Sequence, residues 1–175
     1  KILLDDEYDF FNQLQIGIIY FKQKEYSNSF NYLLKIKKKN SHNFKVFLYL
    51  GNFYVTQEKN PEKAKKCYLK SFELNPECKQ AGKSLSDIYM ALKDWISNEK
   101  LLKSLTKTFM ETNSYQLHWA WMQLGLHYSA IENWDNAVAN LRTYIRLEPT
   151  DVDAWEALAD AYYYRGSYTS AMKCY

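Results

Sequence analysis

The chain has 175 residues, of which 47% are hydrophobic and 17% aromatic, and its formal net charge is +3. This hydrophobic content can form a buried core and excludes intrinsic disorder by composition, while so small a net charge does not by itself indicate a nucleic-acid partner. With only 5 glycines, 3 prolines and no apolar run long enough to span a bilayer, the sequence disfavours strand-and-turn folds and membrane insertion.

Two helical pairs are expected in the N-terminal half. The first covers residues 10–43 and is degenerate, because Gln13 stands where a large apolar residue is expected. The second covers residues 44–78 and is regular. The residues that fall in phase are Ile16, Gly17, Tyr20 and Tyr26 in the first pair, and Phe47, Leu50, Gly51, Tyr54, Ala64, Tyr68 and Pro76 in the second.

Three more pairs follow at the same period, since Trp121 and Trp155 are 34 positions apart. Residues 79–117 form a degenerate unit whose end, Glu111–Leu117, lies outside the period. Residues 118–151 are regular, and residues 152–175 are an incomplete unit. Their in-phase residues are Leu85, Ser86, Tyr89, Trp95 and Leu102, then Trp121, Leu124, Gly125, Tyr128, Trp134, Ala137, Leu141 and Pro149, then Trp155, Leu158, Ala159, Tyr162, Gly166, Tyr168 and Ala171.

The spacing has a physical cause. Positions four, seven, eight and eleven of each first helix share one face. Position eight must be small where the second helix crosses closely, and Gly17, Gly51, Gly125 and Ala159 meet that need. Glycine inside a helix costs about 1 kcal/mol relative to alanine, so its recurrence at this position indicates close packing.

This pattern resembles the tetratricopeptide repeat (TPR). It predicts an all-α fold, a right-handed α-α superhelix, with residues 1–175 forming a single solenoid of about five repeats. Because position 1 is lysine and the last unit is incomplete, we expect an excerpt of a longer chain.

No catalytic motif occurs in the sequence. It lacks a glycine-rich phosphate loop, a His-Glu-x-x-His helix, a nucleophile elbow and a Cys-x-x-Cys pair. His118 and His127 have no obvious third ligand, which disfavours a metal site. We therefore expect a protein that binds others and is not an enzyme, with no cofactor.

The inner groove of such a solenoid is lined by positions two, five, nine, twelve and thirteen of each first helix. The protein-binding candidates read off these positions are Lys45, Asn52, Lys83, Asp87, Trp119, Met122, Asp153, Glu156, Asp160 and Tyr163. A groove of the co-chaperone type, which grips a C-terminal carboxylate, needs Lys or Arg and Asn over three consecutive units. Only Lys45, Asn52 and Lys83 could serve, so this reading is the less favoured alternative.

Two tryptophans receive different interpretations. Trp121 stands at the signature position and is expected in the core. Trp119 should point into the groove, where it either packs against the irregular stretch Glu111–Leu117 or anchors a partner.

The segment from Lys35 to Lys70 holds ten lysines and two acidic residues, Glu58 and Glu62. Helical spacing predicts one shared face of a second helix for four of these lysines. They are the candidate RNA contacts Lys59, Lys63, Lys66 and Lys70. A solvated convex face is the favoured interpretation over an RNA-binding stripe, because the segment contains no arginine.

Three stretches resemble one particular family, the TPR scaffold subunit of the superkiller (Ski) complex. They are residues 45–54 with 64–74, residues 119–128, and residues 155–162 with 165–168. The degenerate unit and the irregular link before Trp119 also fall where that family has them.

The resemblance implies a non-catalytic cytoplasmic scaffold, with a nuclear pool as an alternative. Its implied partners are an RNA helicase subunit and WD-repeat propeller subunits, and indirectly the exosome in 3′-to-5′ mRNA decay. No membrane is implied. Direct RNA contact is the least favoured expectation, and an independent peptide-binding adaptor remains the alternative function.

Overall fold

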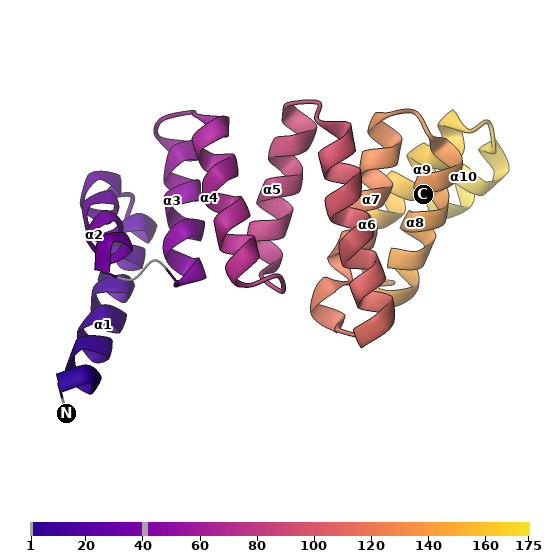
Figure 1. The fold of residues 1–175 in the computed structure, drawn as a ribbon. Helices are drawn as coiled ribbons and strands as arrows, with labels where there is room; N and C mark the ends of the chain where they lie inside the picture. Colours follow the sequence, from indigo (N-terminus) through magenta and orange to yellow (C-terminus); the bar gives the residue numbers. More distant parts are fainter. Residues whose placement is uncertain (1, 40–41) are drawn as a thin grey trace. The chain divides into compact units, whose positions relative to one another are not determined.

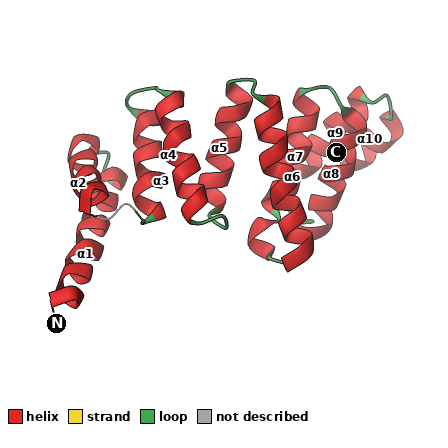
Figure 2. Ribbon diagram, viewed as in Figure 1, coloured by secondary structure: helices red, strands yellow, loops and turns green. Residues whose placement is uncertain are grey.

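The structure is a computed structural model that describes residues 2–39 and 42–175, and within 2–9 and at residue 39 it describes the backbone alone. The described chain is helical and contains no strand (Figures 1 and 2). The helices are α1 (Ile2–Lys22), α2 (Tyr26–Lys39), α3 (Phe44–Thr56), α4 (Pro61–Leu74), α5 (Lys79–Ala91), α6 (Trp95–Thr112), α7 (Trp119–Ala130), α8 (Trp134–Leu147), α9 (Val152–Tyr164) and α10 (Tyr168–Cys174), with a 3₁₀ turn η1 (Tyr115–Leu117) before α7.

Several of the helices pack closely with a neighbour in sequence. Helices α1 and α2, α3 and α4, α7 and α8, and α9 and α10 form closely packed pairs. The chain divides into two compact units, Lys1–Leu85 and Ser86–Tyr175, and the boundary falls inside α5. This helical pairing confirms the all-helical TPR fold that the periodicity predicts.

One turn geometry joins the two helices of each of the five described pairs. The residue two positions before each second helix has a positive φ, between 49° and 85°. These residues are Lys24, Lys59, Lys93, Glu132 and Gly166. The residue that follows donates its backbone N–H to the carbonyl of a tyrosine in the first helix, at 2.8–3.0 Å. The acceptors are Tyr20, Tyr54, Tyr89, Tyr128 and Tyr162. The degenerate pairs therefore share the turn of the regular ones.

The small residues lie where the helices cross. A Cβ atom added to Gly51 would stand 2.6 Å from Cε1 of Tyr68, and one added to Gly125 would stand 2.5 Å from Cγ of Leu141. At Gly17 the nearest atom would be Cδ2 of Leu33 at 3.5 Å, an ordinary contact. The expected close approach is thus confirmed for α3 on α4 and for α7 on α8, and it is relaxed for α1 on α2.

In three pairs an asparagine or aspartate caps the N-terminus of the second helix. The side chains of Asn60, Asp94 and Asn133 accept hydrogen bonds from backbone N–H groups three residues on, at 3.0, 3.2 and 3.4 Å. Such N-caps satisfy donors that the first helical turn leaves without partners. Pro61 follows Asn60 directly, at the first helical position where its missing N–H costs nothing.

Two boundaries differ from expectation. Helix α1 begins at Ile2 rather than near Phe10. Helix α6 has 18 residues, four more than the 14 of α4 and α8, and it ends at Thr112, where Asn113 adopts a left-handed conformation. The extra turn of α6 and the η1 turn account for the stretch that lies outside the sequence period.

Each unit has an apolar core of its own. In the N-terminal unit Leu14, Leu33 and Ile36 pack with Val46 and Leu50. In the C-terminal unit the buried apolar side chains include Leu102, Leu124, Leu141, Ala137, Ala154, Leu158, Ala159 and Ala171. Within the described residues no helix combines the length and the apolar character needed to cross a membrane.

Candidate protein-binding surfaces

The groove candidates of the N-terminal unit lie on α3 and on the start of α5. Lys45 and Lys83 are exposed, and Asn52 is half-buried. The hydroxyl of Tyr68 on α4 donates to Oδ1 of Asn52 at 2.7 Å, so this amide is oriented by the second helix of its own pair. This hydrogen bond fixes the orientation of the amide and leaves its NH₂ group available to a ligand.

Helix α7 distinguishes the two interpretations of Trp119, which are packing against the irregular stretch and anchoring a partner. Trp119 is 3% exposed, so its indole is not presented as a groove residue. Trp119 is the first residue of α7 and follows η1 directly. Helical side chains lean toward the N-terminal end of their helix, which directs this ring toward the preceding link rather than outward. Met122 is half-buried, and the ring of Trp121, also half-buried, meets Phe109 edge-on at 6.5 Å.

Helix α9 presents the most exposed set of candidates. Asp153, Glu156, Asp160 and Tyr163 are all exposed. Their spacing places them along one face of α9. Asp160 accepts a hydrogen bond from the hydroxyl of Tyr175 at 2.6 Å, which raises the pKa of Tyr175 to about 12. Asp87 on α5 is exposed as well.

The lysine face differs from the expected stripe. Lys59 is not on a helix, because it occupies the left-handed position of the turn before α4. Lys63 pairs with Glu58 at 2.7 Å and Lys70 with Glu73 at 3.1 Å. Lys66 is exposed on α4. Neighbouring carboxylates therefore neutralise two of the three helical lysines that were candidates for phosphate contacts.

A polar cluster that the sequence did not reveal ties the irregular link to the turn between α8 and α9. The Tyr115 hydroxyl donates to Glu148, and Nε2 of His118 lies 3.4 Å from the same carboxylate. The His118 ring stacks between Tyr115 at 4.4 Å and Tyr144 at 5.9 Å. The cluster fixes the out-of-period residues to the following pair. The only signal for it in the sequence is the break in the period itself.

A second polar group lies buried between α6 and α7. His127 is fully buried, and its Nδ1 lies 3.2 Å from Nδ2 of Asn98, which is also fully buried. Burial lowers the pKa of His127. Nearby, hydrogen bonds from Lys103 and Tyr128 hold the pKa of Glu99 below its usual range. These groups join α6 to α7.

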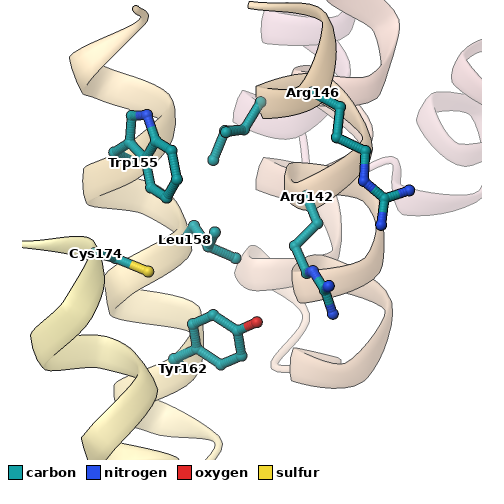
Figure 3. Close-up of a pocket in the computed structure, with 7 residues that line it drawn as sticks. Arg142, Arg146, Trp155, Leu158, Tyr162 and Cys174 are labelled. Carbon is teal, nitrogen blue, oxygen red and sulfur yellow. The ribbon is translucent and has the colours of Figure 1, made fainter. Parts of the chain in front are cut away.

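An open cavity of about 300 Å³ lies between α8, α9 and α10 (Figure 3). Arg142 and Arg146, one turn apart on α8, face Trp155, Leu158 and Tyr162 on α9. The α9 side chains are signature residues of the repeat, so this cavity lies between packed helices of the repeat.

The described part of the chain shows no candidate metal site. No group of three or more His, Cys, Asp or Glu side chains is arranged there to hold a metal ion. The exposed faces of the helices are the candidate surfaces for binding.

Comparison with protein families matches residues 45–78 and residues 122–175 to models described as tetratricopeptide repeat. Superkiller complex protein 3 from Mus musculus is 31% identical over 166 residues, 92% of this chain, and the Homo sapiens protein matches equally. Superkiller protein 3 from Schizosaccharomyces pombe is 25% identical over 91% of the chain. The chain spans about a tenth of the length of these relatives.

Solved structures agree on the fold. The MamA protein superposes with a TM-score of 0.72 at 20% identity, covering 94% of this chain and 87% of that one. A tetratricopeptide-repeat protein from Parabacteroides merdae also gives 0.72, at 18% identity, over 94% of this chain and 62% of its own. At these identities the likeness concerns the fold alone.

Proposed function

Because the chain belongs to the tetratricopeptide-repeat family and is homologous to superkiller complex protein 3, we propose that it is a protein-binding scaffold segment of a superkiller-type complex. In this role it holds other subunits and catalyses no reaction. The assembly it serves supports cytoplasmic 3′-to-5′ mRNA decay by the exosome.

The observation that carries the proposal is the extent of the relationship. The tetratricopeptide-repeat models leave residues 79–121 unmatched, whereas the mouse relative aligns over 92% of the chain and therefore through that region. Residues 79–121 include the long α6, η1 and the start of α7. A relationship that extends through the irregular part of the chain supports a specific family within the repeat proteins.

The proposed partners are a helicase subunit and a WD-repeat propeller subunit, with the exosome reached through them. The exposed first-helix residues Lys45, Lys83, Asp153 and Glu156 are the proposed contacts. We also propose that the five helix pairs are consecutive repeats of one array. RNA contact by α4 is not required, and two of its three candidate lysines are already paired.

An independent adaptor of the co-chaperone type is the alternative that a test must exclude. That function needs lysine and asparagine side chains free to bind a peptide carboxylate. The Tyr68 hydroxyl engages only Oδ1 of Asn52, so the NH₂ group that would bind a carboxylate stays available and the alternative must be tested by experiment.

A capture experiment separates the two functions. The chain, immobilised through an N-terminal tag, is incubated with nuclease-treated cytoplasmic extract, and bound proteins are identified by mass spectrometry. Recovery of a superkiller helicase or propeller subunit is expected. The proposal would be contradicted if chaperones alone are recovered and a chaperone tail peptide prevents their recovery.

A matched pair of variants localises the contact. Charge reversal of the exposed α9 residues Asp153 and Glu156 should reduce recovery of the partner. Charge reversal of Glu111 and Lys107, which pair with each other at 3.8 Å on α6, should leave recovery unchanged.

A further inference from the structure

Four aromatic side chains form a continuous row where α8 and α10 begin and α9 ends. The ring of Trp134 stacks on Tyr164 with centroids 5.0 Å apart and planes at 21°. Tyr164 meets Tyr163 at 5.5 Å, and Tyr163 meets Tyr168 at 5.4 Å. We name these four residues the aromatic row. Tyr163 and Tyr164 stand at groove positions twelve and thirteen of their repeat, whereas Trp134 and Tyr168 do not.

The row lies on the surface of the C-terminal unit. Tyr163, Tyr164 and Tyr168 are 54%, 63% and 60% exposed, and Trp134 is half-buried. Contiguous exposed aromatic side chains on a folded protein mark interaction sites, and Tyr and Trp are enriched among the residues that dominate binding energy. Tyrosine also offers a large rigid surface at little cost in side-chain entropy.

Carboxylates continue the row along α9. Asp153, Glu156 and Asp160, here named the acidic stripe, are exposed and lead to Tyr163 and Tyr164 on one helical face. No ion pair joins any of the three to a cation within the described residues. The nearby cation of the turn, Arg165, is already bound to Asp135 at 2.8 Å. The surface therefore combines exposed π faces with uncompensated negative charge.

These two features select one ligand chemistry. A planar guanidinium stacks on tyrosine rings and also binds carboxylates through two parallel hydrogen bonds, which a lysine ammonium cannot do. Nucleic acid would bring phosphates against the acidic stripe, where like charges repel. We propose that the aromatic row and the acidic stripe together bind an arginine-rich extended segment of a protein partner.

The size of the surface sets the length of the segment. From Asp153 to Tyr164 the helix rises about 16 Å. An extended peptide advances about 3.3 Å per residue, so about five residues span the surface. The inference rests on the proposed function, because the acidic stripe belongs to its groove candidates. It adds Trp134 and Tyr168 to the surface and names the chemistry of the partner.

The test measures fluorescence anisotropy of a labelled peptide in which arginine alternates with glycine. The wild-type chain should bind it and should bind the matching lysine–glycine peptide more weakly. Replacing both Tyr164 and Tyr168 by serine should weaken the arginine peptide about fivefold to thirtyfold. Replacing both by phenylalanine, which keeps the rings, should leave most of the affinity.

Matched variants separate the two halves of the surface. Glu156→Gln with Asp160→Asn should weaken binding and flatten its dependence on salt, because charge is removed while the row is kept. Met110→Ser, at another exposed apolar side chain (67% exposed), should change nothing. Circular dichroism confirms that each variant is folded before binding is measured.

Several results would overturn the inference. They are equal binding of the arginine and lysine peptides, affinity unaffected by serine at both tyrosines, and preferential binding of a single-stranded uridine oligonucleotide. None of them bears on whether a superkiller subunit is captured. Conversely, capture can fail while the arginine peptide binds, so failure of either proposal can be told from failure of the other.

Discussion

Gly51→Ala tests whether the small residues of the repeat are required by helix crossing. The added Cβ would lie 2.6, 2.8 and 2.9 Å from Cε1, Cδ1 and Cζ of Tyr68. Tyr68 is 2% exposed, and its hydroxyl is held by Asn52. The ring can therefore relieve the overlap only by disturbing the packing of α3 on α4 or by loosening that hydrogen bond.

The magnitude follows from two opposing effects. Overpacking of a well-packed core costs about 1–3 kcal/mol. Replacing glycine by alanine within a helix gains about 1 kcal/mol. The net change expected for Gly51→Ala is thus a destabilisation of about 0–2 kcal/mol.

Gly17→Ala is the matched control in the same unit. Its added Cβ would make only an ordinary 3.5 Å contact with Leu33, so the helix gain should appear alone and stabilise the chain by about 1 kcal/mol. Since that gain cancels in the comparison, the two variants should differ by about 1–3 kcal/mol.

Urea unfolding followed by far-ultraviolet circular dichroism measures both variants, with the free energy of unfolding obtained by linear extrapolation. Equal stabilisation by the two substitutions would refute the reasoning, because it would mean that Gly51 is not confined by Tyr68.

Three further predictions follow from the turns, the buried histidine and the lysine face. Burial lowers the pKa of His127 in the folded chain. As the pH falls below about 6.5, the unfolded chain therefore takes up the proton first, and the stability present above that pH is lost. The urea midpoint, followed by tryptophan fluorescence, should fall on acidification, and it should fall less in His127→Phe. Gly166 has a φ of 85°, so Gly166→Ala should cost about 1 kcal/mol, whereas Lys59→Gly should stabilise the chain at its own left-handed position, both read from thermal unfolding. Lys63→Glu combined with Lys66→Glu should leave RNA affinity and its salt dependence unchanged in a filter-binding assay. A weaker dependence of RNA affinity on salt in this variant would instead support RNA binding by α4.

Much of the fold can be predicted from the sequence because each repeat imposes the same packing requirement on the same positions. The expected unit starts at 44, 79 and 152 coincide with the first residues of α3, α5 and α9. Gly51 and Gly125 indicate the close crossings because no larger side chain fits there. A periodic requirement for small residues is visible in sequence for this steric reason.

The turns were less predictable. Four of the five left-handed positions hold lysine or glutamate, residues with no preference for positive φ. A local backbone hydrogen bond from the next residue to the tyrosine carbonyl closes the end of the first helix and stabilises this conformation. For the same reason the sequence placed Lys59 on a helix, although it lies in the turn before it.

The surfaces were the least predictable. Helical position predicts the direction of a side chain, but not whether a non-periodic segment covers it. Trp119 is buried beside the η1 link, which interrupts the periodic pattern. The aromatic row combines residues from three helices, and the repeat pattern assigns its members Tyr163 and Tyr164 to the groove but not Trp134 or Tyr168.

Direct binding of purified subunits tests the central claim most directly. The chain is mixed with a purified superkiller helicase subunit, a purified WD-repeat propeller subunit, or both, and the complex is followed by analytical ultracentrifugation without RNA. The scaffold account predicts a faster-sedimenting complex with at least one of them. The account would be contradicted if the chain sediments at the same rate with and without both subunits, at concentrations where a chaperone tail peptide binds it.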